Sequence, residues 1–165
     1  MKKCFLLFAF LSCTSPLFAI DAVYLGGQVG YVSLTGDPAK NFPNAIGFGA
    51  DLGLRTNAFV DIVLSFQTSS HSGLTAYAPF LSADIHLGQL HDFDFIVGAG
   101  PGFYFFKTSS GTDSNFGINV GGAIDAVVDD SIRIGLGSRY HAVFNGNRGG
   151  SYWTVMMRLG YLFQS

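Results

Sequence analysis

Apolar residues alternate with small or polar ones, with a period of two, through almost the whole chain after residue 21. This is the period of a β-strand, whose successive side chains point to opposite faces. Ile46, Phe48 and Leu52, for example, have one parity, and Asp51 and three glycines have the other. The chain contains no Glu, which long amphipathic helices normally use together with Lys. The sequence therefore predicts a single all-β domain.

The alternation divides into eight predicted strands, separated by links that contain Gly, Ser, Asn and Asp. Their expected bounds are 23–34, 44–55, 58–68, 74–87, 93–108, 115–128, 131–144 and 151–163. Four links, 36–43, 69–73, 109–114 and 145–150, are expected to be longer loops. The links at 56–57 and 129–130 are expected to be tight turns, and 88–92 to be intermediate. Longer and shorter connections therefore alternate along the chain.

Two architectures share this pattern. A soluble barrel or sandwich would bury the apolar face, whereas a transmembrane barrel turns it toward lipid. Charged residues make up only 12% of the chain, and the non-apolar parity carries Asp and Arg mixed with glycine, which suits a narrow lumen. The strands are also long enough for the ~9–11 tilted residues that cross a bilayer. We therefore predict an eight-stranded antiparallel up-and-down transmembrane β-barrel, with Trp153, Tyr161 and Phe163 near the membrane interfaces.

The N-terminus has the features of a signal peptide. Lys2 and Lys3 precede an apolar run at 4–11, and Ala19 offers a small residue for cleavage. We expect a signal peptide over 1–19, with cleavage after Ala22 as the alternative, and a barrel domain over 20–165. A membrane anchor is not expected, because the apolar run is too short to span a bilayer as a helix. Both cysteines lie in this segment, so the mature chain is expected to have no disulfide.

The polar parity predicts a network of charges inside the barrel. Its expected members are Asp51, Arg55, Asp61, Asp84, Asp125, Arg133, Arg139 and Arg158. If the first strand rises from the periplasm, most of them fall in the periplasmic half, together with His86 and Asp94. Arg139 falls higher, with His141, Gln28, Gln67 and Asn119. Because buried charges must be paired, we expect the lower cluster to form an Asp–Arg plug, with an open pore as the competing hypothesis.

Three stretches carry a resemblance to a known group. Residues 97–104 (VGAGPGFY), residues 116–123 (FGINVGGA) and Arg139-Tyr140-His141 resemble the fifth, sixth and seventh strands of the small OmpA/OmpX-like outer-membrane β-barrels. The C-terminal run 158–163 is similar to the aromatic end of that family, although Gln164 and Ser165 follow it. We expect no peptidoglycan-binding domain after the barrel and therefore no wall-anchoring role like that of the two-domain members.

The resemblance implies a protein of the Gram-negative outer membrane with a structural or surface-interaction role. Its implied surroundings and partners are outer-membrane lipid, lipopolysaccharide and the outer-membrane assembly machinery, and its implied state is a monomer. A narrow pore or a small hydrophobic-ligand conduit, as in the OmpW-like barrels, is the alternative. A nucleic-acid partner is not expected, because the net charge is −2 and no basic block is present.

An enzyme of the lipid A-modifying barrels is the third hypothesis. His141 lies in a segment that resembles the histidine segment of the lipid A deacylases, but Val143 stands where that family has Ser, and there is no Glu to orient the imidazole. Ser69-Ser70-His71 is the only local candidate for palmitoyltransferase-like chemistry. The four histidines come from different segments without metal-ligand spacing. We therefore expect no catalytic activity, no cofactor and no metal.

Overall fold

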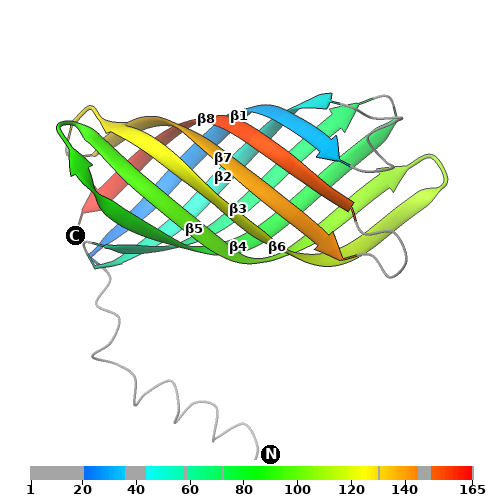
Figure 1. Cartoon of the computed structure of the whole chain (residues 1–165), viewed down its shortest axis with the longest axis horizontal. Coiled ribbons are helices and arrows are strands. Elements are labelled where there is room, and N and C mark those ends of the chain that lie inside the picture. Colours follow the sequence, from blue (N-terminus) through cyan, green and yellow to red (C-terminus); the bar gives the residue numbers. More distant parts are fainter. Residues whose placement is uncertain are drawn as a thin grey trace, which may run out of the picture.

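The computed structural model describes residues 21–35, 44–57, 59–71, 73–129, 131–144 and 150–164. They form one closed antiparallel barrel in which each strand pairs with its neighbours in sequence (Figure 1). The strands are β1 (Ala22–Thr35), β2 (Asn44–Asn57), β3 (Val60–His71), β4 (Leu74–Leu90), β5 (Phe93–Thr108), β6 (Gly111–Val127), β7 (Ile132–Phe144) and β8 (Gly150–Gln164). The predicted fold is confirmed, and the expected signal peptide and its cleavage after Ala19 lie outside the described residues.

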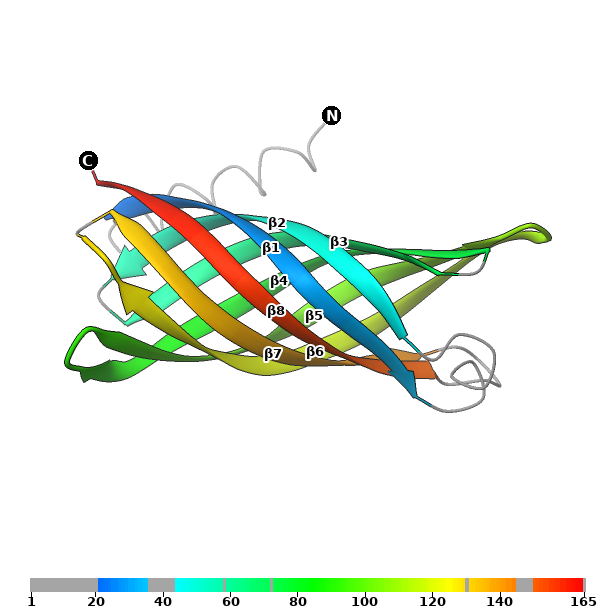
Figure 2. The same cartoon turned by 90° about the horizontal axis from the view of Figure 1, so that it is seen from above.

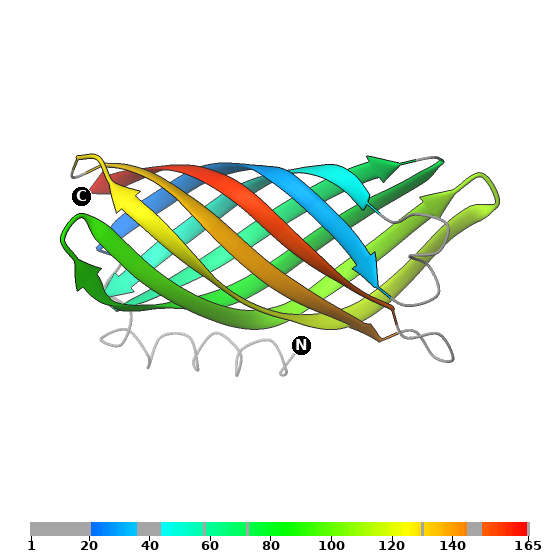
Figure 3. The ribbon, with the colours of Figure 1, turned by 45° about the horizontal axis from the view of Figure 1, so that its top comes forward.

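The barrel closes because β1 pairs with β2 on one side and with β8 on the other. Ala22 lies opposite Gln164 and Thr35 opposite Ser151, so the whole of β1 takes part in the closure. The strands are tilted relative to the long axis of the barrel (Figure 3), as closure requires. The start of β1 and the end of β8 lie together, at what we call the terminal end; the opposite end, with the links β1–β2, β3–β4, β5–β6 and β7–β8, is the loop end (Figure 1).

Two of the four expected long loops are tight turns instead. His71 pairs with Leu74 and Thr108 pairs with Gly111, so β3 and β6 extend into the regions expected to be loops. Gly73 and Gly111 have φ values of 87° and 153°, and glycine enters this region without the steric cost that other residues meet. The β5–β6 hairpin consequently projects beyond its neighbours at the loop end (Figure 2). The long links expected at 36–43 and 145–150 lie almost wholly outside the described residues.

The apolar parity faces outward and the polar parity faces inward. Leu64 and Met157 expose 51% and 59% of their surface on the outside, whereas Asp51 and Asp94 inside expose only 2% each. A soluble barrel would show the reverse, so the soluble alternative is wrong. In the described part of the chain, no helix is long and apolar enough to cross a membrane.

Outward aromatic pairs lie toward both ends of β8. The ring centroids of Tyr140 and Trp153 are 4.9 Å apart near the loop end, and those of Tyr161 and Phe163 are 4.7 Å apart near the terminal end. Eight residue steps from Trp153 to Tyr161, at ~3.3 Å per residue and a typical strand tilt, span about 20 Å along the axis. This separation approaches the height of the apolar band of an outer-membrane barrel, which agrees with the expected interface positions.

Pairing between β4 and β5 has two gaps, in addition to a register shift between His86 and Gly88. The paired residues step from Tyr77↔Phe105 to Phe80↔Gly102 and then to Ala83↔Ala99. The gaps coincide with Pro79 on β4 and Pro101 on β5, and proline has no N–H to donate to a ladder. Inside the barrel, the Asn119 amide donates to the Gly100 carbonyl at 2.8 Å, so a side chain from β6 satisfies a backbone group beside the second gap.

Candidate functional site

The lumen is the candidate site, and it consists of two halves of different chemistry. Toward the terminal end it contains carboxylates, guanidinium groups and one histidine; we call this part the charged half. Toward the loop end, a cluster of buried apolar and aromatic residues fills it; we call this part the aromatic half. Its members are Val32, Ala78, Phe80, Tyr104, Val143, Tyr152 and Met156.

Glycines on the inward face make room for the charged side chains. Strand pairing sets Asp84 opposite Gly98 and Asp125 opposite Gly135. A Cβ atom on Gly98 would lie 2.0 Å from Asp84 Oδ1, and one on Gly135 would lie 2.1 Å from Asp125 Oδ1. Any larger residue would displace these carboxylates, so the mixture of Asp, Arg and Gly seen in the sequence has a steric cause.

His86 is the centre of a five-residue cluster near the terminal end. Its Nδ1 lies 2.7 Å from Asp94 Oδ2, and its Nε2 lies 2.9 Å from Asp61 Oδ2. Arg55 binds Asp61 with two nitrogens, at 2.9 and 3.0 Å. Arg133 donates to Asp94 at 2.9 Å. The cluster joins β2, β3, β4, β5 and β7, and it therefore crosses the lumen from one wall to the other.

The other expected network residues lie between this cluster and the aromatic half. Arg139 lies 3.3 Å from Asp84 and also donates to Asn119. Arg158 lies 3.8 Å from Asp125, a looser contact. The first pair joins residues that the sequence placed at different depths, and the second joins β6 to β8 across β7.

Asp51 has a different kind of partner from the other inward carboxylates. The Ser65 hydroxyl donates to its Oδ1 at 2.6 Å, and the Gln28 amide donates to its Oδ2. A small polar hollow lies beside it, lined by Asp84, Arg139 and Arg158 among others. The charged half is thus a set of bonded groups around a small internal space.

The buried charges balance with every carboxyl ionised when His86 carries a proton on each ring nitrogen. Five inward carboxylates, Asp51, Asp61, Asp84, Asp94 and Asp125, face four guanidinium groups, Arg55, Arg133, Arg139 and Arg158. Each ring nitrogen of His86 lies against a carboxylate oxygen, and an imidazolium ion has two N–H donors for these two acceptors. A doubly protonated His86 supplies the fifth positive charge, at a position where Arg55 Nη2 also lies 3.1 Å from Nε2.

The aromatic half contains the second inward histidine. His141 is fully buried. Its ring stacks on Tyr152, with centroids 4.3 Å apart and planes 9° apart, and Phe80 and Tyr104 pack against it edge-on. The Tyr104 hydroxyl lies 3.1 Å from His141 Nδ1. The strands β4, β5, β7 and β8 thus each contribute one ring to a layer that fills this part of the lumen.

This aromatic layer was not predicted from the sequence. The expectation of a polar lumen held for the charged half, whereas Phe80, Tyr104 and Tyr152 also have inward parity. A usable signal was present, since strict alternation fails at 103–106 and 140–144, where both parities carry apolar or aromatic residues. Such a run indicates a strand segment with water on neither face, which in a membrane barrel means lipid outside and a packed lumen inside.

The candidate enzyme residues are dispersed. His141 lies in the aromatic layer. Ser69 and His71 have inward parity and line a hollow at the loop end, whereas Ser70 points outward and lies 3.2 Å from the Thr75 hydroxyl. Among the described residues, no group of three or more His, Cys, Asp or Glu side chains could hold a metal ion.

Comparison with solved structures identifies the fold. Neisserial surface protein A (NspA) superposes with a TM-score of 0.70 at 12% identity, covering 84% of this chain and 96% of that one. The N-terminal β-barrel domain of Pseudomonas aeruginosa OprF gives 0.66 at 15% identity, covering 87% and 98%. The outer-membrane protein AlkL gives 0.55 at 12% identity, covering 88% and 92%.

No family model matches the sequence, and no curated protein is significantly similar to it. The evidence for the fold is therefore structural similarity and the lipid-facing surface, without support from sequence similarity. Outward leucines and phenylalanines, inward charges and closure by eight antiparallel strands are all features of barrels of the bacterial outer membrane. This chain is an eight-stranded transmembrane β-barrel of the outer-membrane type, similar in fold to NspA and to the OprF barrel domain.

Proposed function

We propose that this protein is a closed, non-enzymatic barrel of the Gram-negative outer membrane, with a structural role or one performed by its outer surface. It sits in outer-membrane lipid and lipopolysaccharide as a monomer, after insertion by the assembly machinery. The observation that carries the proposal is the pair of layers in series across the lumen. One is the His86 cluster with its four charged partners, and the other is the aromatic layer around His141.

Physical reasons support closure by these two layers. An eight-stranded barrel has an interior just wide enough for side chains to fill. An ion entering the charged half would have to separate pairs such as Arg55–Asp61 and Arg133–Asp94, and each separation leaves a buried charge without a partner. Beyond them, the stacked rings of His141 and Tyr152 offer no charged or solvated path. Passage is therefore opposed twice, by different interactions.

The two alternative functions, a pore or conduit and an enzyme, place further requirements on this lumen. A narrow pore or a conduit for a hydrophobic ligand needs both layers to open, and a lipid A-modifying enzyme needs a nucleophile, a base and an orienting acid together. The best-placed serine and histidine, Ser69 and His71, lie inside the loop-end hollow, whose lining includes no Asp among the described residues. These observations support the non-enzymatic proposal.

Single-channel recording in planar lipid bilayers tests the closed lumen. The wild-type barrel is expected to show no steady ohmic current. Arg158→Ala, in the charged half, and Tyr152→Ala, in the aromatic half, are each expected to stay silent, because the other layer remains. The double variant is expected to conduct. Lys107→Ala, at an exposed outward position on β5, is the matched control, and a stable wild-type current would overturn the proposal.

A further inference from the structure

Strand pairing fixes the relative heights of outward residues along the barrel axis. A line of paired residues that starts at Val23 on β1 returns to β1 at Ser33, ten residues nearer the loop end. Between these two it passes through Leu54, Ile62, Ala83, Ala99, Val120, Tyr140 and Trp153. The line therefore rises by about 1.25 residues at each of the eight strand-to-strand steps, which is the stagger of a closed barrel with tilted strands.

This rise identifies residues that lie level with one another. The line through Ser70 on β3 continues to Thr75 on β4, Lys107 on β5 and Thr112 on β6. Over these three steps the line gains about four residues. The outward residue of β6 that is level with Ser70 is therefore Phe116, which lies four residues from Thr112 toward the terminal end. A small hydroxyl on one side of the barrel is thus level with an aromatic ring on another.

The same contrast extends around the outer surface at the loop end. In a band about two residues high that contains Ser70, each strand presents one outward residue. On β8 and on β1 to β4 these residues form what we call the low rim: Ser151, Ser33, Asn44, Ser70 and Thr75. On β5 to β7 they form the high rim: Phe105, Phe116 and Phe144. All members of the low rim are polar, and all members of the high rim are phenylalanine.

The apolar outer surface therefore ends at two heights. Below the low rim, the first outward apolar residues are Trp153, Tyr31, Ile46, Phe66 and Tyr77. These lie, on average, about two to three residues lower than the high rim. At ~3.3 Å per residue and a typical strand tilt, the difference is a step of about 6 Å. The apolar belt is thus taller beside β5, β6 and β7 than beside the other strands.

The high rim is suited to contact with hydrocarbon. The ring centroid of Phe116 lies 5.7 Å from that of Phe103 and 6.3 Å from that of Phe144, so the rings form a continuous apolar surface. Lys107, two residues beyond Phe105, is the only charged residue of outward parity in the strands that the structure describes. Lysine near a membrane surface keeps its ammonium group in the polar layer, which places the edge of the hydrocarbon above the high rim.

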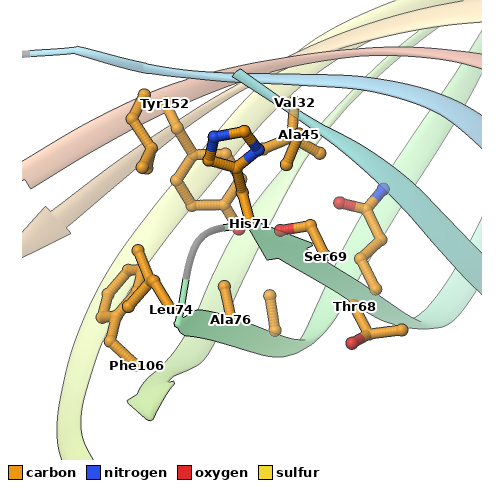
Figure 4. Close-up of a pocket in the computed structure, with 12 residues that line it drawn as sticks. Val32, Ala45, Thr68, Ser69, His71, Leu74, Ala76, Phe106 and Tyr152 are labelled. Atoms are coloured by element: carbon orange, nitrogen blue, oxygen red, sulfur yellow. The ribbon is translucent and has the colours of Figure 1, made fainter. Parts of the chain in front are cut away.

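The low rim is suited to polar surroundings. Ser70 Oγ lies 3.2 Å from Thr75 Oγ1, and either atom can donate. A single bond between two hydroxyls leaves the second O–H without an acceptor in that pair, and hydrocarbon offers none. Thr68, two residues below Ser70, also points away from the lumen, on the opposite side of β3 from Ser69 and His71 (Figure 4). Polar groups therefore continue below the low rim on β3.

We infer that the barrel holds the membrane leaflet at its loop end at two heights. Beside β8 and β1 to β4, lipid headgroups and their water descend to the low rim, where hydroxyl and amide groups receive hydrogen bonds from them or donate to them. Beside β5 to β7, acyl chains cover the high rim. The leaflet is thus thinner on one side of the barrel by about 6 Å. This inference goes beyond the closed-barrel proposal, because it concerns the outer surface and does not depend on the lumen.

Spin labels at level positions measure the step. Outside the expected signal peptide the chain contains no cysteine, so single labels are introduced by Ser70→Cys or Phe116→Cys in dimyristoylphosphatidylcholine vesicles. Power saturation compares access of oxygen, which concentrates in hydrocarbon, with access of a water-soluble nickel chelate. The label at 116 is expected to lie deeper than the label at 70 by about 6 Å, the height of the step. Equal depths would mean a level leaflet and would overturn the inference.

A second pair of labels distinguishes a step from a tilt of the whole barrel. Val60→Cys and Ala126→Cys lie on the same two strands, each ten residues nearer the terminal end. A thinner leaflet at the loop end leaves these two labels at equal depth. A rigid tilt would instead move both β3 labels in one direction along the membrane normal and both β6 labels in the other. Unequal depths of this lower pair, in the sense that a tilt requires, would also overturn the inference.

Substitution of the low rim tests its chemistry. Ser70→Val/Thr75→Val removes two hydroxyls, and a label at Asn44→Cys on the adjacent strand β2 is expected to gain access to oxygen and lose access to the chelate. Thr112→Val, above the high rim on β6, is the matched control and is expected to leave that label unchanged. Heat-dependent migration on a denaturing gel establishes that each variant is folded. An unchanged label in the folded Ser70→Val/Thr75→Val barrel would show that the low rim does not set the leaflet height.

Discussion

The two inward histidines occupy the same lumen under opposite conditions. His86, in the charged half, has a carboxylate against each ring nitrogen. His141, in the aromatic half, is surrounded by Phe80, Tyr104 and Tyr152, and its Nε2 is buried without a partner among the described residues. One imidazole belongs to an ionic network, and the other is packed as a ring.

The difference shows two ways of filling a narrow barrel. In the charged half, each group depends on the others, because removing one partner leaves a buried charge uncompensated. In the aromatic half, shape and area dominate, and the polar atoms contribute little. The two halves should therefore respond very differently to substitution, which can be measured as the free energy of unfolding.

The largest effect is expected from Asp94→Ala. This change leaves both His86 and Arg133 without their shared carboxylate, and loss of one member of a buried ion pair costs about 3–5 kcal/mol. Reversible urea titration in lipid vesicles, followed by the fluorescence of the single tryptophan, Trp153, measures the loss. Asp113→Ala, an exposed carboxylate on β6, is the control. Equal stability of the two variants would contradict the ionic description of the charged half.

An intermediate effect is expected from Gly160→Ala. A Cβ at Gly160 would lie 2.0 Å from a ring carbon of Tyr24, and overpacking of this kind costs about 1–3 kcal/mol. Gly27→Ala is the matched control on β1, because a Cβ added there would have no atom within 4 Å and the position faces outward. The same titration compares them. Similar stability for both would mean that the charged half adapts to added volume.

A smaller effect is expected in the aromatic half. His141→Phe removes the partner of the Tyr104 hydroxyl and should cost about 1 kcal/mol. The double variant His141→Phe/Tyr104→Phe removes both polar partners and should lie within about 1 kcal/mol of the wild type, because replacing both members of a pair with apolar groups of similar shape is nearly neutral. A loss as large as that of Asp94→Ala would remove the distinction between the two halves.

The last prediction concerns protonation and involves no change in stability. At neutral pH, nitrogen chemical shifts of the histidine rings should show two protonated nitrogens in His86 and one in His141. The physical reason is the number of acceptors, two carboxylates for His86 and none for His141. Spectra of His86→Gln and His141→Phe assign the signals, and a neutral His86 ring would break the charge balance inferred above.

Much of the fold was predictable because a strand pattern is local. Alternation located all eight strands, and β5 has the predicted bounds. The errors lie at turns, where β6 begins four residues earlier than expected because Gly111 permits a tight hairpin. The composition of the charged half was also predictable from the sequence, because Asp and Arg that alternate with lipid-facing apolar residues have to face inward.

The sequence alone determined which face each residue occupies, because parity depends only on the period of the strand. The lipid-facing belt, the inward charges and the number of strands all follow from it. Partners were decided by the tertiary structure. Strand register and barrel closure bring Arg133 of β7 to Asp94 of β5, and they gather Phe80, Tyr104, His141 and Tyr152 into one layer. These contacts depend on how far each strand is shifted against the next, and no local pattern encodes that shift.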